Sequence, residues 1–118
     1  MVNQLPTKVL IAVDNQECTD AAIQSALARQ WEPDTTFLLC KVVEDFGSIM
    51  KIYKNEHSKV LEAEQEAYTY EMRLWLSQTT TEFARVQPQV ESCLEFGRAA
   101  EKLCEIAYSW GADYMIIG

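Results

Sequence analysis

Hydrophobic residues gather in nearly unbroken runs at three places along the chain. Residues 9–13, 36–43 and 114–117 are apolar almost without interruption, and each run is followed by polar residues or glycine. Short continuous runs are typical of strands buried on both faces of a parallel sheet. Residues 89–96 instead alternate between apolar and polar, which predicts a strand with one exposed side, near an edge of the sheet.

Between these runs, apolar residues recur at helical spacing in three stretches. We predict a first helix with Thr19 as its N-cap, closed by Pro33. Residues 59–85 form the longest helical pattern. Residues 99–110 form the last one, with Gly111 placed to be the left-handed residue that follows a helix.

Strands and helices therefore alternate along the whole chain, in the order β-α-β-α-β-α-β. Because crossovers between parallel strands are right-handed, this order predicts an α/β fold, an open parallel sheet with helices on both faces. We expect residues 1–118 to form a single domain, since this length is too short for two. The loops after the first and last strands would frame one crevice if those strands are neighbours.

Asp14 is the first candidate functional residue, because it stands where the first predicted strand ends. Ligands of open parallel sheets bind in the crevice outside the carboxyl ends of the strands. A carboxylate there can accept hydrogen bonds from an amide or a sugar hydroxyl. The alternative is that the Asp14 side chain only caps the loop that follows.

Composition narrows the ligands and partners. The chain has 118 residues, of which 48% are hydrophobic and 24% charged, and its formal net charge is −8. This acidic balance argues against binding to nucleic acid, whose phosphate backbone it would repel. A single bound nucleotide remains compatible with it, because backbone amides can hold phosphates without net positive charge.

The chain contains four cysteines and one histidine. Their scatter does not match the spacing of a zinc site, so we expect no metal site in the protein itself. Cys40 and Cys93 fall inside predicted strands, where small buried hydrophobic residues are expected. His57 lies in residues 48–58, a stretch without clear period that we expect to cross the crevice as a loop or partly helical excursion, and it has no nucleophile spaced for catalysis. Unpaired cysteines, the lack of a leader and the lack of a membrane-spanning run favour a cytoplasmic protein.

The chain resembles the universal stress protein family in residues 8–14, 39–43, 97–101 and 110–118. The most specific of these is the last, a helix end followed by Gly-Ala-Asp, four apolar residues and glycine. The resemblance implies a Rossmann-like sheet of the adenine nucleotide α-hydrolase type, with strand order 3-2-1-4 and the usual fifth strand missing. It also implies a stress-response module that forms homodimers or higher oligomers, and many members of the family bind ATP.

The same resemblance implies a set of site residues. Ala12, Val13 and Asp14 would line an adenosine site, with Asp14 reaching the base or the ribose. The backbone of Val42 would meet adenine, and a phosphate loop would start at Ile117 and Gly118. ATP, with Mg or Mn, is therefore the candidate ligand, although the sequence requires no cofactor.

Two departures from the family pattern keep an alternative open. Nucleotide-binding members carry a glycine loop of which only the first glycine, Gly118, is present, and Asn15 replaces the glycine common after the aspartate. Glycines let backbone N–H groups close around phosphates. The alternative is thus a member without nucleotide that acts through dimerisation and protein–protein contacts. We expect no catalytic residues, and a slow ATPase at most, because no nucleophile–base pair is visible.

Residues 114–117 raise a further expectation, because nothing after them would cover an apolar strand. Such an edge would favour pairing with other chains. We expect the domain to be incomplete at its C-terminus, or a second chain to supply the cover.

Overall fold

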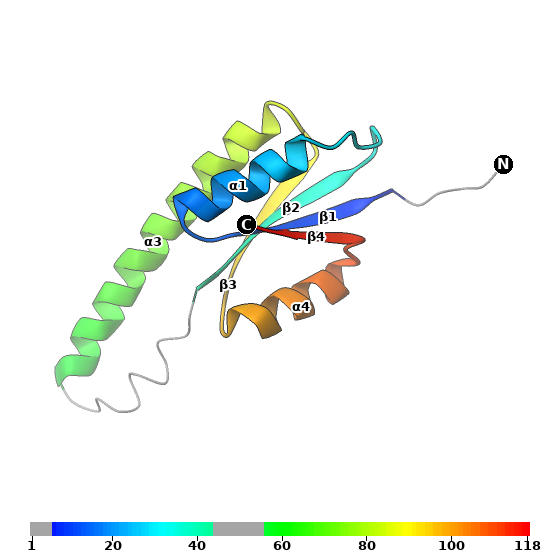
Figure 1. The fold of residues 1–118 in the computed structure, drawn as a ribbon. Coiled ribbons are helices and arrows are strands. Elements are labelled where there is room, and N and C mark those ends of the chain that lie inside the picture. The colour runs from blue at the N-terminus through cyan, green and yellow to red at the C-terminus, as the bar shows by residue number, and fades with distance from the viewer. Residues whose placement is uncertain (1–5, 44–55) are drawn as a thin grey trace.

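Four parallel strands form the centre of the molecule (Figure 1), in a computed structural model that describes residues 6–43 and 56–118. The sheet order is β3-β2-β1-β4. The elements are β1 (Lys8–Val13), α1 (Gln16–Leu27), β2 (Thr36–Val43), α3 (Glu56–Ala84), β3 (Val90–Phe96), α4 (Ala99–Trp110) and β4 (Tyr114–Ile117). The predicted α/β fold and strand order are therefore confirmed. Of the excursion predicted for residues 48–58, residues 48–55 lie outside the described residues, and residues 56–58 belong to α3.

The two faces of the sheet carry separate hydrophobic layers, because successive residues of a strand point to opposite sides. On one face, odd-numbered residues such as Val9, Ile11 and Phe37 pack under α1 and α3. On the other face, even-numbered residues such as Leu10 and Leu38 pack against α4. Figure 1 shows this arrangement, with α1 and α3 together on one side and α4 alone on the other.

The edge strands differ from the central ones in exposure. β3 lies at an edge and is only partly buried, as its alternating sequence predicts. The unbroken apolar run of β4 predicts a buried strand, which is not observed, whereas the expectation of an apolar strand without cover agrees with the structure: Tyr114 is 49% exposed and Ile117 is 67% exposed. The reason is that β4 pairs with β1 on one side and forms the other edge of the four-strand sheet.

The start of α1 differs from the prediction. Asn15, not Thr19, is the N-cap, and its side chain accepts a hydrogen bond of 2.8 Å from the Cys18 amide. Thr19 is fully buried within the helix, where its hydroxyl accepts a 3.0 Å hydrogen bond from the Asp14 amide. Asn15 is the N-cap because it lies in the turn itself, where its side-chain oxygen reaches the first free amides of the helix.

The end of α1 also comes earlier than Pro33. The helix stops at Leu27, and Trp31 folds back so that its indole N–H donates to the Ala26 carbonyl at 2.7 Å. The Trp31 ring meets Phe37 edge-on with centroids 5.7 Å apart. The tryptophan therefore belongs to the core through a loop rather than through the helix. The end of α4 follows the prediction, because Gly111 has a left-handed φ of 82°.

Candidate functional site

A cavity of about 270 Å³ opens at the carboxyl edge of the sheet. It lies beside the first turns of α1 and α4. Its lining residues are Ala12, Val13, Asp14, Cys18, Cys40, Val42, Ala99, Leu103, Ile117 and Gly118. All six residues that the sequence singled out are among these ten, although what they bind stays a prediction. Two hollows of about 520 Å³ lie elsewhere and are more open to solvent.

Strand register explains how residues so distant in sequence meet. Ala12 of β1 pairs with Cys40 of β2 on one side and with Ile117 of β4 on the other. The carboxyl ends of these three strands therefore lie next to one another. The same register places Lys41 opposite Val13, one residue before Asp14.

Four lining residues were missed by the sequence interpretation: Cys18, Cys40, Ala99 and Leu103. Two signals could have found three of them. Cys40 is two residues before Val42, so the two share a face of the strand, and Ala99 and Leu103 are four residues apart on one face of a helix. Cys18 gives no such signal, because its position depends on where α1 begins.

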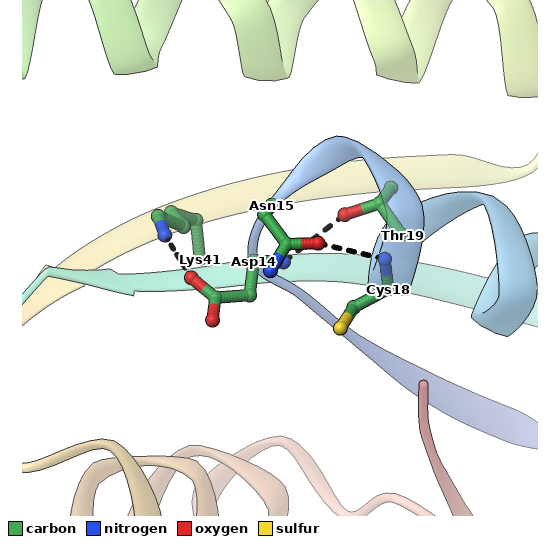
Figure 2. A network of polar contacts seen from close by, with 5 residues as sticks. All are labelled: Asp14, Asn15, Cys18, Thr19 and Lys41. Carbon is green, nitrogen blue, oxygen red and sulfur yellow. Dashed lines mark hydrogen bonds and ion pairs between the residues drawn. The ribbon is translucent and has the colours of Figure 1, made fainter.

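Asp14 is held by an ion pair with Lys41, as Figure 2 shows. The Lys41 Nζ lies 2.6 Å from Asp14 Oδ1, with the lysine side chain 6% exposed and the aspartate side chain 73% exposed. The lysine is thus a buried cation whose partner reaches out to solvent. The contact fixes one carboxylate oxygen and leaves the other without a partner among the drawn residues.

The turn after Asp14 is closed by its neighbours rather than by the Asp14 side chain. Asn15 bonds to the Cys18 amide, and Thr19 accepts from the backbone amide of Asp14. Figure 2 shows both contacts on the turn that leads into α1. The structure therefore does not support the alternative that the Asp14 carboxylate only caps this loop, because the Asn15 side chain makes the capping hydrogen bond.

Gly118 lies against the first turn of α1. A Cβ atom built on this residue would stand 1.9 Å from the Cys18 carbonyl oxygen and 3.2 Å from the Ala22 backbone nitrogen. Because the obstacles are backbone atoms of a helix, they cannot rotate away as a side chain would. A glycine is therefore required at this position for packing alone.

The N-terminus of α4 is free of a side-chain cap. Arg98 is its N-cap residue and its side chain makes no capping hydrogen bond, while the next residue, Ala99, lines the cavity. The first amides of a helix carry a partial positive charge and are good donors to anions. The side chain of Arg98 is 86% exposed, and its guanidinium lies 3.6 Å from the Glu101 carboxylate.

Two absences concern the part of the chain that the structure describes. No three His, Cys, Asp or Glu side chains gather as a metal site among residues 6–43 and 63–118, whose side chains are described. None of the described helices has both the length and the apolar character that crossing a membrane requires.

The parallel sheet and its cavity define an open-sheet α/β protein, with the cavity at the point where strand order reverses between β1 and β4. The sequence profile of the universal stress protein family matches residues 6–118. The chain belongs to the universal stress protein family.

Solved structures agree with this assignment at the level of the fold. The chain is similar to hypothetical protein MJ0577, at 21% identity and a TM-score of 0.74, over 95% of this chain and 74% of that one. It is similar to universal stress protein UspA from Lactobacillus plantarum, at 19% identity and a TM-score of 0.62, over 97% and 77%. It is similar to protein Rv1636 from Mycobacterium tuberculosis H37Rv, at 15% identity and a TM-score of 0.57, over 99% and 74%. No curated protein matches the chain.

Proposed function

We propose that the cavity binds an adenine nucleotide, ATP with its divalent ion, and that the domain acts in the stress response as a regulatory module rather than as a catalyst. One observation carries this proposal: residues from β1, β2, β4 and α4 converge on one cavity that ends in an exposed carboxylate. Such a mixture of apolar walls and one oriented polar group is typical of small-molecule sites.

The cavity suits the base and the sugar. Ala12, Val42 and Ile117 give apolar walls for a flat ring. Asp14 offers its second carboxylate oxygen to a ribose hydroxyl or to the amino group of adenine, and Lys41 keeps the carboxylate in one orientation. A volume of about 270 Å³ is just below the usual range for sites of small ligands, so the phosphates would lie outside it.

The start of α4 is the candidate for the phosphates. Its first amides are not capped by a side chain, and Arg98 is exposed beside them. The amides would offer an anion the partial positive charge of the helix N-terminus, and the Arg98 guanidinium would add a full positive charge. This support does not use the glycine loop that the family resemblance implies for nucleotide-binding members.

The experiment is a titration of the purified protein with a fluorescent ATP analogue, followed by competition with unlabelled ATP, GTP and adenosine. We expect ATP to compete, and Asp14→Ala to weaken binding by about ten- to a hundredfold, because a hydrogen bond to a charged group is worth about 1.5–3 kcal/mol. Asp34→Ala is the matched control, since Asp34 is an exposed aspartate in the turn before β2, at the opposite edge of the sheet. No binding at millimolar ligand, or equal losses in both variants, would overturn the proposal.

A second function is favoured by the exposure of β4. Its residues Tyr114 and Ile117 are 49% and 67% exposed, and one edge of the strand is unpaired among the described residues. We propose that a second copy of the chain covers this edge in a homodimer. Light scattering after gel filtration tests it: Tyr114→Ser should weaken the dimer, whereas Tyr70→Ser, on the exposed side of α3, should not. A monomer at all concentrations would refute it.

A further inference from the structure

Cys40 and Cys93 face each other across two neighbouring strands. They are register partners in the pairing of β2 with β3, and their sulfur atoms are 3.2 Å apart. Neighbouring strands are about 4.8 Å apart, which falls within the Cα separations that disulfides span. A sulfur–sulfur bond is about 2.05 Å long, so the two sulfur atoms must approach each other by about 1 Å. The side chains can make this approach without a movement of the backbone.

The two thiols differ in their access to solvent. Cys40 is fully buried, and its side chain lies in the wall of the carboxyl-edge cavity. Cys93 is half-buried and lines an open groove of about 520 Å³ between β3 and α4. A small oxidant can therefore reach Cys93 from solvent, whereas Cys40 is reached only through Cys93 or through the cavity.

Their electrostatic environments reinforce this difference. The hydrogen bond with Cys40 lowers the pKa of Cys93, and this effect outweighs burial and the charge of Glu95, which act in the opposite direction. The hydrogen bond with Cys93, together with burial, raises the pKa of Cys40. Cys93 thus combines the lowered pKa with the greater access to solvent, and the thiolate is the form that reacts with oxidants.

We propose that Cys40 and Cys93 form a peroxide-sensitive dithiol, which closes reversibly into a disulfide between β2 and β3. The Cys93 thiolate attacks one oxygen of hydrogen peroxide, the O–O bond breaks, and the departing hydroxide takes a proton to leave as water. The resulting sulfenic acid on Cys93 is attacked by the Cys40 sulfur, and its S–O bond breaks to release a second water. In sum, two thiols and one peroxide give one disulfide and two waters, and a dithiol reductant reverses the step by exchange.

This site is independent of any nucleotide, but it is adjacent to the cavity. Cys40 contributes its side chain to the cavity wall and to the sulfur pair at once. Closing the disulfide draws this side chain toward β3. Oxidation of Cys93 in the groove would therefore change the shape of the carboxyl-edge cavity.

The experiment uses the full chain with Cys18→Ser and Cys104→Ser, which leaves only the pair. After hydrogen peroxide, free thiols are alkylated and tryptic peptides are analysed by mass spectrometry. We expect a disulfide between Cys40 and Cys93 within one molecule, two hydrogens lighter and fully reversed by dithiothreitol. The same protein with the added change Cys40→Ala should form no disulfide and should accumulate a sulfenic acid at Cys93 that dimedone traps.

Three outcomes would overturn the proposal. One is that both thiols remain fully alkylated at peroxide concentrations that oxidise free cysteine. Another is that disulfides form only between molecules, seen as dimers on a non-reducing gel. The third is that Cys93 is oxidised equally to sulfenic acid with and without Cys40. Because the unsubstituted chain gives the same disulfide peptide directly, the test does not depend on whether every variant folds.

Discussion

Removing the Asp14 carboxylate should destabilise the fold as well as the site, because it leaves the buried Lys41 cation alone. The lysine side chain is 6% exposed and the aspartate side chain is 73% exposed, so the pair lies between two known limits. Exposed pairs contribute about 0.2–1 kcal/mol, and breaking a fully buried pair costs about 3–5 kcal/mol. We expect Asp14→Ala to lower the free energy of unfolding by about 1–2 kcal/mol, since water can partly hydrate the ammonium group.

Urea unfolding followed by tryptophan fluorescence measures this loss. With a slope of about 1–1.5 kcal/mol per molar urea, the midpoint should fall by roughly 1 M. Lys41→Met removes the charge and keeps the packing of the stem, so in that background Asp14→Ala should cost less than about 0.5 kcal/mol. If Asp14→Ala costs the same in both backgrounds, the two side chains do not stabilise each other and the argument fails.

Asp34→Ala is the control for the change of charge. Asp34 is exposed and makes no ion pair within the part of the chain that the structure describes. Its substitution should shift stability by less than about 0.5 kcal/mol. This comparison separates the contact with Lys41 from the general effect of removing one negative charge from an acidic protein.

Three further predictions follow from single contacts. Thr19→Val should cost about 1–3 kcal/mol in urea unfolding, because the Asp14 amide loses its 3.0 Å acceptor in a buried place. Gly111→Ala should lower stability by about 1 kcal/mol, and Gly111→Asn by less, because φ is 82° and no atom is close enough to clash. Cys40→Ala should move alkylation of Cys93 by iodoacetamide to higher pH, because it removes the hydrogen bond that lowers the Cys93 pKa; an unchanged pH profile would contradict this. Thermal and urea midpoints that do not move would contradict the first two.

Much of the fold could be predicted because the buried strands carry their own pattern. Residues 9–13 and 36–43 are apolar on both faces, and the structure buries both faces with helices. The alternation before Gly97 correctly placed β3 at an edge. For these three strands the polarity of the run reflects how many of its faces are covered, whereas the apolar run of β4 is partly exposed in the described structure.

The capping of α1 could not be read in the same way. Asn15 and Thr19 are both good N-cap residues, and the choice depends on where the turn after β1 directs the backbone. The helix was expected to continue to Pro33, whereas Trp31 lies in a loop and reaches the core by bonding back to Ala26. Tertiary contacts decide these boundaries, and periodicity does not record them.

The candidate site was predicted in its list of residues but not in its interactions. The order of strands brings Ala12, Val42 and Ile117 together, and that order came from the family resemblance. The contact of Asp14 with Lys41 and that of Cys40 with Cys93 depend on register, which brings together residues that are 27 and 53 positions apart in sequence. Register is set by the packing of the whole sheet, so neither pair was visible beforehand.

The close approach of Gly118 to α1 bears on how relatives of this chain are sorted. Two main chains touch there, and any substituent larger than hydrogen at residue 118 would wedge β4 away from the first turn of α1. A glycine aligned with this position in another sequence consequently reports that helix and strand meet, whether or not a phosphate is ever bound.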